Sequence, residues 1–203
     1  MRDKVVDKIM IKIKSKYSSK FSDTKLLEIR YGLQGIYTII TKTLGIFLIA
    51  FVFGFVKEFL IFNLFYIPLR SVGYGTHANS NLSCWIYSIF LILGIPLLIS
   101  YLKLSAIVKI ILWIICFIAF LLFSPADTKK RPMINKKRKL KFKFAILIIS
   151  VIYLVLILKF KDLSDLVISA MLLESLLVSP LGYILMGEEI RFSLNDLYIF
   201  KLN

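Results

Sequence analysis

The sequence predicts an all-α, polytopic membrane protein. Hydrophobic residues make up 59% of its 203 residues, and its mean hydropathy is +0.82. Soluble domains contain about 45–50% apolar residues, so the excess needs a cover other than water, and lipid is the simplest one. Long apolar runs alternate with short polar or basic segments, which is typical of membrane-spanning helices joined by loops. At this length we expect a single membrane-embedded domain over residues 1–203.

The charge distribution indicates a membrane surface rather than a nucleic acid as the basic regions' partner. The formal net charge is +15, from 27 Lys and Arg against 12 Asp and Glu. Nine basic residues fall within residues 1–30 and nine more within 129–143, with apolar runs between them. Basic clusters beside membrane spans mark cytoplasmic loops and attract anionic lipid headgroups. An acidic peptide would be attracted as well, and no nucleic-acid partner is expected.

Residues 1–32 form a basic N-terminal segment for which we expect an interfacial helix. Apolar residues recur at helical spacing on one face, with lysines on the others: Val5, Val6, Ile9, Met10 and Ile13. That pattern is typical of a helix lying on an anionic membrane surface. A solvated basic arm is the alternative. The segment has no long apolar core of the kind found in a cleavable signal peptide, so insertion would depend on the later spans.

The remaining apolar runs predict about six membrane-associated helices in all. Residues 33–69 are too long for one span and short for two, so we expect a helical hairpin or re-entrant pair, broken near Lys57 and Glu58 and ended by Pro68. Four further runs are each near spanning length, and Pro96 should kink the first of them. These runs are residues 85–102, 104–123, 144–160 and 163–186.

The Lys and Arg bias predicts the orientation of the chain. Residues 124–143 form the one long basic loop and should be cytoplasmic. Two spans back along the chain, residues 70–84 then lie on the same cytoplasmic side, and so does the C-terminus two spans ahead. The basic N-terminus also favours the cytoplasm, which requires an even number of crossings within residues 33–69.

The polar segment RSVGYGTHANSNLSC at residues 70–84 is the best candidate for chemistry. It holds the only histidine, His77, and one of the two cysteines, Cys84. A helix starting at residue 82 or 83, capped by Asn81 or Ser83, would place Cys84 in its first turn, where the helix dipole favours a thiolate. His77 could then accept the thiol proton. Cys116 lies within an apolar run and is expected to be a small core residue.

The spacing of His77 and Cys84 imposes a geometric condition on this pair. On one straight helix the two side chains would lie about 10 Å apart, whereas proton transfer needs about 3 Å. The chain must therefore turn between them, and Asn79, Ser80 and Asn81 provide turn-forming residues. A lone histidine near a lone cysteine can also be unrelated to catalysis, because two residues alone define no family.

Three charged residues are further candidates, each with an alternative role. Arg70 could bind a carboxylate or a carbonyl beside the pair, or extend to the membrane interface. Asp127 could orient His77, or serve as a cap or loop residue. Glu174 lies inside an apolar run, where an ionisable group is costly. It could pair with Lys42, line a peptide path, or sit protonated in a helix interface.

No cofactor or metal is predicted. The two cysteines have no zinc-like spacing, and neither a GxxxxGK[ST] loop nor an HExxH pattern is present. An energised pump or a metalloprotease is therefore disfavoured.

Three sequence blocks, taken together, resemble the accessory gene regulator protein B family (AgrB) of membrane peptidases that process quorum-sensing propeptides. The first is the segment at 70–84, through Arg70, Gly73, Gly75, His77 and Cys84. The second is EIRYGLQ at 28–34, and the third is FSPADTKKRP at 123–132. Size, charge and span layout agree as well, so the resemblance covers nearly the whole chain. The glycine segment, GYGTH, departs from the aromatic or small residues expected directly before the histidine.

The resemblance implies both a reaction and its residues. Cys84 matches the nucleophile and His77 the general base, while Arg70 and Gly75 match supporting positions. Lys129, Lys130 and Arg131 match a basic stretch that handles the propeptide. The implied substrate is an AgrD-like propeptide with an acidic C-terminal part. Cys84 would release that part, and a side chain of the retained peptide would close a thiolactone or lactone ring. A homodimer is also implied. The rival interpretation is a non-enzymatic peptide exporter or transporter subunit.

Overall fold

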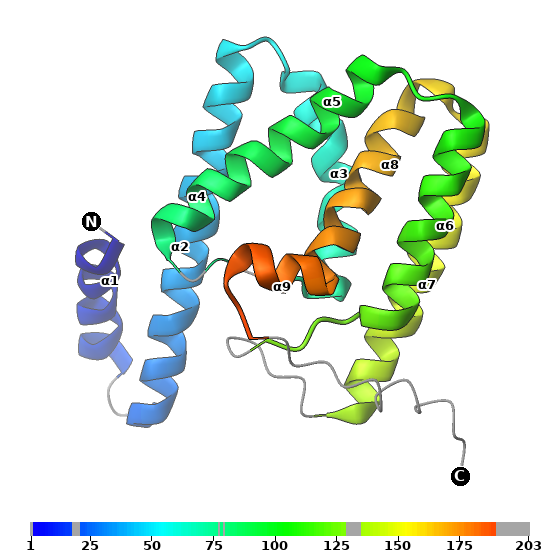
Figure 1. Cartoon of the computed structure of the whole chain (residues 1–203). Coiled ribbons are helices and arrows are strands. Elements are labelled where there is room, and N and C mark those ends of the chain that lie inside the picture. The colour runs from blue at the N-terminus through cyan, green and yellow to red at the C-terminus, as the bar shows by residue number, and fades with distance from the viewer. Residues whose placement is uncertain (1, 18–20, 77, 79, 129–134, 190–203) are drawn as a thin grey trace. The chain divides into compact units, whose positions relative to one another are not determined.

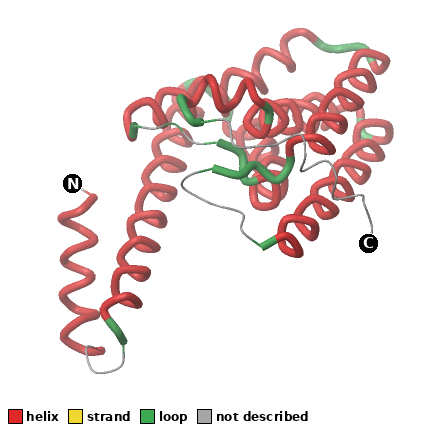
Figure 2. Tube along the Cα trace, turned by 60° about the horizontal axis from the view of Figure 1, so that its bottom comes forward, coloured by secondary structure: helices red, strands yellow, loops and turns green. Residues whose placement is uncertain are grey.

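The computed structural model describes residues 2–17, 21–76, 78, 80–128 and 135–189. Helices account for nearly all of this part of the chain, and none of it is a β-strand (Figure 2). Four helices are long and apolar enough to cross a membrane, and a bent helix pair adds a fifth candidate span. The prediction of an all-α polytopic membrane protein is confirmed. The chain forms two compact units, residues 1–53 and 54–203.

The first unit pairs a short helix with a long one. Helix α1 (Arg2–Tyr17) packs on the first turns of α2 (Asp23–Val52) through a small apolar core, formed by Val6, Met10 and Leu26. Part of the apolar face expected to meet lipid therefore packs against α2 instead. Val5 and Ile9 stay 38% and 40% exposed, so a membrane-facing role for α1 remains a prediction.

The break in the 33–69 region comes earlier than predicted. Helix α2 ends at Val52, and α3 (Val56–Gly73) begins three residues after Phe53. Gly54 has a φ of +77°, a backbone conformation that suits glycine, and it separates the two helices. Lys57 and Glu58 thus lie in the first turn of α3 rather than at the break. The expected end at Pro68 is also wrong, because α3 continues through Pro68 to Gly73.

The second unit is built around one buried helix. Helix α8 (Lys161–Val178) contacts α3, α5, α6, α7 and α9 (Figure 1). Its buried residues lie on every face of the helix, as expected for a helix surrounded by others. They include Ile168, Met171 and Leu173, each at most 1% exposed. The core of this unit therefore follows α8.

Two of the four predicted spans match continuous stretches of helix. The 85–102 run forms α4 (Asn81–Ile89), a π-helical stretch (Phe90–Gly94) and α5 (Ile95–Leu102). A kink is expected at Pro96, and the structure has a π-helical stretch just before it. Proline favours this irregularity because it cannot donate the usual backbone hydrogen bond and its ring crowds the carbonyl four residues earlier. The 104–123 run forms α6 (Ala106–Phe123).

The other two spans require correction. Helix α7 (Lys136–Lys159) begins inside the predicted loop 124–143, because Asn135 caps it and Lys and Arg are good helix formers. The 163–186 run is not one straight helix. It breaks at Ser179 into α8 and α9 (Pro180–Met186), which are bent by 75°. Pro180 favours the break because it has no backbone N–H to continue the helix.

Candidate active site

Cys84 lies near the start of α4, as predicted, but a different residue caps the helix. Ser80 is the cap: its backbone is extended, and its hydroxyl accepts a hydrogen bond of 3.0 Å from the Ser83 N–H. Asn81, one of the two expected caps, is the first helical residue. The Cys84 N–H donates to the Ser80 carbonyl at 3.0 Å. The thiol is thus attached at the positive end of the helix dipole, which favours a negative charge.

The Cys84 side chain is partly buried at the edge of the core and near charged groups. Arg70 and Tyr66, both on α3, lie within electrostatic reach of its thiol. Cys116 contrasts with it: its side chain is 0% exposed in the core and accepts a hydrogen bond from Ser175. The prediction that Cys116 is a core residue is confirmed.

Arg70 turns inward from the last turn of α3. Its Nη1 lies 3.5 Å from Oε2 of Glu174, and its Nη2 donates to the Thr76 carbonyl at 2.9 Å. Burial alone would lower the pKa of the guanidinium, but Tyr66 and Glu174 raise it, and the net shift is upward. Arg70 therefore contacts a carboxylate and a carbonyl of the protein itself, and its role toward the substrate stays a prediction.

Glu174 pairs with Arg70 inside the second unit, and its pairing with Lys42, which belongs to the first unit, stays a prediction. The Glu174 side chain is 0% exposed, and besides the ion pair its Oε1 accepts a hydrogen bond of 3.3 Å from the Gly75 N–H. The sequence contained a partial signal for this contact, since small residues at positions 73 and 75 leave room for a large side chain close to the backbone. It could not identify which chain segment fills that room.

Gly73 and Gly75 have no space for a side chain. A Cβ atom at Gly73 would meet Glu174 Oε1, and one at Gly75 would meet the Arg70 Nη1 and lie 2.8 Å from the Leu177 Cβ. Glycine is therefore required at both positions by close packing around the ion pair. This gives a physical reason for the Gly75 that the sequence resemblance singled out.

The residues on either side of position 77 are buried, and Thr76 is bonded to α8. The Thr76 N–H and hydroxyl both donate to the Leu177 carbonyl at 2.9 Å. Thr76 and Ala78 are 1% and 5% exposed. His77 lies outside the described residues, so its pairing with Cys84, and its orientation by Asp127, stay predictions.

The first and third sequence blocks meet in space. The Ala126 N–H donates to the Gly73 carbonyl at 2.9 Å, and the Tyr183 hydroxyl donates to the Asp127 carbonyl at 3.0 Å. The backbone of FSPAD therefore runs beside the glycine segment. Lys129, Lys130 and Arg131, which follow it, lie outside the described residues.

The start of α7 also contacts the glycine segment. The Arg138 Nη2 donates to the Tyr74 hydroxyl at 3.2 Å, and the Tyr74 ring packs on Phe142 at 5.1 Å between ring centroids. Tyr74 has a φ of +59° and ends α3. The tyrosine of the GYGTH segment thus contacts the basic helix.

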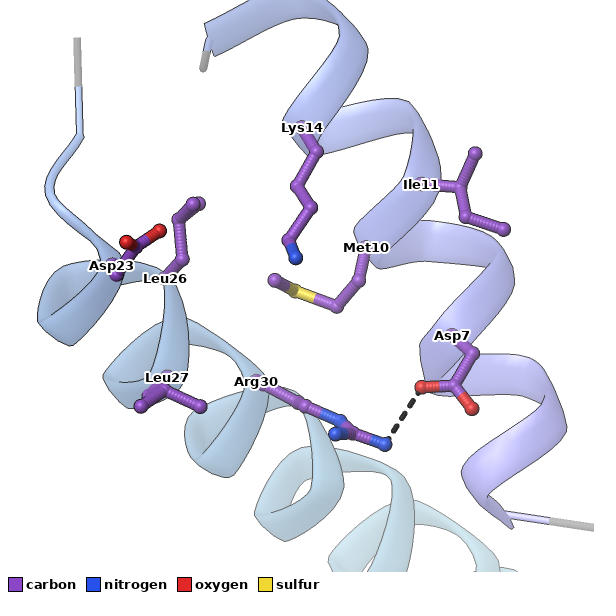
Figure 3. A pocket seen from close by; sticks show the side chains of 8 residues that line it. All are labelled: Asp7, Met10, Ile11, Lys14, Asp23, Leu26, Leu27 and Arg30. Atoms are coloured by element: carbon purple, nitrogen blue, oxygen red, sulfur yellow. Dashed lines mark hydrogen bonds and ion pairs between the residues drawn. The ribbon is translucent and has the colours of Figure 1, made fainter. Parts of the chain in front are cut away.

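The second sequence block, EIRYGLQ, lies on α2 in the first unit and contacts α1. Arg30 forms a 2.8 Å ion pair with Asp7, and Gln34 donates to Asp3 at 3.0 Å, so this block attaches α1 to α2. Figure 3 shows the Arg30–Asp7 pair beside a hollow of about 400 Å³ with Met10 and Leu26 in its wall.

Sequence reasoning missed a second buried charge cluster, at the N-terminal end of α8. The Lys109 Nζ lies 2.8 Å from the Asp165 Oδ1 and donates to the Ser164 hydroxyl at 2.6 Å. Lys109 is only 8% exposed although it belongs to a predicted span. Its position within the apolar run of α6 was a signal, because a lysine at such depth needs an anionic partner.

Comparison with known proteins gives a consistent family assignment. The sequence profile described as Accessory gene regulator B matches residues 4–178. An Accessory gene regulator protein B of Staphylococcus epidermidis is 28% identical over 159 residues, which are 78% of this chain and 82% of the relative. The Staphylococcus carnosus (strain TM300) protein of that name is 33% identical over 115 residues, 57% of this chain and 60% of the relative. The Accessory gene regulator protein B of Staphylococcus aureus (strain Newman) is 24% identical over 160 residues, which are 79% of this chain and 85% of the relative.

No solved structure matches the chain. The sequence match itself runs from α1 to the end of α8 and includes Arg70, Gly75, Cys84 and Glu174. The chain belongs to the Accessory gene regulator B family.

Proposed function

We propose that this protein is a membrane cysteine endopeptidase that processes and cyclises a quorum-sensing propeptide. Family membership supports the coarser part of this proposal, a role in accessory gene regulator peptide processing. The observation that carries the finer part is the placement of Cys84. Its thiol sits at the capped start of α4, where the helix dipole favours negative charge, and the half-buried Arg70 on α3 lies within electrostatic reach of it.

The proposed reaction has two acyl transfers. The Cys84 thiolate attacks a peptide carbonyl of the propeptide and forms a thioester, while the C-terminal fragment leaves as an amine that takes up a proton from protonated His77. A cysteine or serine side chain of the retained peptide then gives its proton to the now neutral His77 and attacks the thioester. The product is a thiolactone or lactone ring, and Cys84 is released as a thiolate.

The basic start of α7 supports an acidic leaving fragment. Lys136, Lys137, Arg138 and Lys141 are exposed there, and Arg138 contacts Tyr74 beside the site. Opposite charges steer a substrate toward a site before binding. Lys129, Lys130 and Arg131, just before this helix in sequence, would extend the same positive region on the cytoplasmic side. Anionic lipids and a second copy of the chain are the other proposed partners.

The test is a processing assay with purified protein in lipid vesicles. The substrate is a candidate propeptide encoded near this gene, and mass spectrometry detects the released C-terminal fragment and any propeptide–protein adduct. Wild type should give both products. Cys84→Ala should give neither, and His77→Ala should reduce cleavage strongly. Crosslinking of the same vesicles tests for the dimer.

Cys116→Ala is the matched control, because Cys116 is the other cysteine and lies buried away from solvent. It should process the propeptide at nearly the wild-type rate. If Cys84→Ala processed the propeptide as wild type does, the cysteine mechanism would be wrong. The non-enzymatic peptide exporter would then be favoured, and transport of the unprocessed peptide across the vesicle membrane would test it.

A further inference from the structure

We infer that Glu174 is a positioning residue for this site: from α8 it holds Arg70 and the backbone of Gly75 and Thr76, the residues that directly precede His77 in the sequence. The inference rests on the proposed function and adds a residue that neither the sequence motifs nor the comparisons assign to it.

The first support is that one carboxylate contacts both sides of the turn. Oε2 of Glu174 pairs with Arg70 on α3, and Oε1 accepts from the Gly75 N–H. The same Arg70 donates to the Thr76 carbonyl. Glu174, Arg70 and the backbone of residues 75 and 76 therefore form one connected set of polar contacts.

The second support is the match between α8 and the segment before His77. Leu177 lies one helical turn after Glu174, and its carbonyl accepts both Thr76 hydrogen bonds. Residues 75 and 76 are thus each bonded to α8, at Glu174 and Leu177. The backbone directly before position 77 is therefore held against α8 at two successive residues.

The third support is that a carboxylate is costly at this position unless the site needs it. Glu174 is fully buried, and a buried ion pair is often no more stabilising than apolar residues of similar size. Simple helix packing would be satisfied by leucine, as at neighbouring positions of α8. The carboxylate does what leucine cannot: it accepts the Gly75 N–H and orients the guanidinium, which in turn lies within reach of the Cys84 thiol.

Asp165 provides a matched control on the same helix. It too is in an ion pair, with Lys109, although its side chain is 23% exposed, and it lies nine residues earlier, about 13 Å along α8. Asp165→Asn and Glu174→Gln each neutralise one carboxylate of an ion pair. Both should lower the thermal unfolding temperature, but only Glu174→Gln disturbs the segment before His77.

The experiment measures kcat and KM for propeptide cleavage, and the rate at which iodoacetamide alkylates Cys84, in the full-length protein in lipid vesicles. We expect Glu174→Gln to lower kcat roughly 10- to 100-fold, as small misplacements of reacting groups do, with KM within about twofold. Cys84 alkylation should slow as well, because Arg70 is no longer oriented. Asp165→Asn should keep the wild-type kcat and alkylation rate.

Two results would overturn the inference: a wild-type kcat for Glu174→Gln, or losses of kcat in both variants that simply follow their losses of thermal stability. If Glu174→Gln does not fold, Glu174→Asp replaces it. This variant keeps the charge but draws the carboxylate back from Gly75, and a wild-type kcat would again overturn the inference. A Cys84→Ala arm separates the two proposals, since undiminished cleavage there refutes the cysteine mechanism itself.

Discussion

The Arg70 guanidinium on α3 and the Glu174 carboxylate on α8 form an ion pair at 3.5 Å inside the second unit. Gly73 and Gly75 lie against this pair, with no room for a Cβ atom on either. The pair thus connects the helix that ends at the glycine segment with the central helix of the core. The polar segment that carries the candidate chemistry is held by the core at this point.

Two replacements of Arg70 should distinguish the effect of its positive charge from the effect of its planar guanidinium geometry. Arg70→Lys keeps the charge, but one ammonium cannot reproduce the planar fork that contacts both Glu174 and the Thr76 carbonyl. We expect this variant to fold and to process the propeptide about tenfold more slowly. Arg70→Gln leaves the Glu174 carboxylate buried without its cation, so its free energy of unfolding should fall by about 3–5 kcal/mol. Chemical unfolding and the processing assay check both; a wild-type rate for Arg70→Lys would contradict this role.

Gly75→Ala should impair the site through one added methyl group. Its Cβ would meet the Arg70 guanidinium and the Leu177 side chain, and such overpacking costs about 1–3 kcal/mol. We expect processing to fall at least about tenfold, because relieving the clash displaces Arg70. Gly35→Ala is the control: nothing lies within 4 Å of its added Cβ, and alanine is the better helix former. Equal activity of the two variants would show that Gly75 is not required by packing.

The positions of the helices followed largely from the apolar pattern, and the errors have physical reasons. Hydropathy located α6 and the α4–α5 stretch, because lipid requires runs of about 20 apolar residues. It missed the start of α7, since basic residues lower hydropathy but form helix readily. It also treated α8 and α9 as one span, although Ser179 and Pro180 stood in the sequence as a break signal.

The candidate site could be predicted only in part. The thiol at a helix start followed from local signals around Cys84, such as the run of capping residues before it. The partner of Glu174 did not, because Gly75 and Glu174 are 99 positions apart. The apolar run around Glu174 indicates that its carboxylate is in an apolar environment, but only the packing of α3 on α8 brings Arg70 to it.

Removing the cap of α4 should affect activity more than stability. Ser80→Ala loses the hydroxyl that accepts from the Ser83 N–H, which costs about 1 kcal/mol. The equilibrium constant for unfolding the first turn of α4 would rise by up to about fivefold, and the position of Cys84 depends on that turn. Ser105→Ala removes the equivalent cap of α6, far along the bundle, at a similar cost. Processing should fall for Ser80→Ala alone, and similar losses of rate in the two variants would refute a local effect.

The basic start of α7 should determine how tightly an acidic propeptide tail binds. Lys136, Lys137 and Lys141 are exposed there, and three exposed ion pairs at about 0.5 kcal/mol each amount to about 1.5 kcal/mol, close to tenfold in affinity. Changing all three to Gln should therefore raise KM by up to about tenfold, leave kcat near wild type, and weaken the dependence of KM on salt.

The control for that variant neutralises three exposed lysines near the other ends of the helices, Lys103, Lys159 and Lys161. Helix α7 has 24 residues, so its two ends are about 36 Å apart. Both triple variants lose the same net charge, but only the first lies beside the segment that Arg138 and Tyr74 connect to the site. An equal rise in KM for the two variants would mean that total charge, rather than this surface, attracts the substrate.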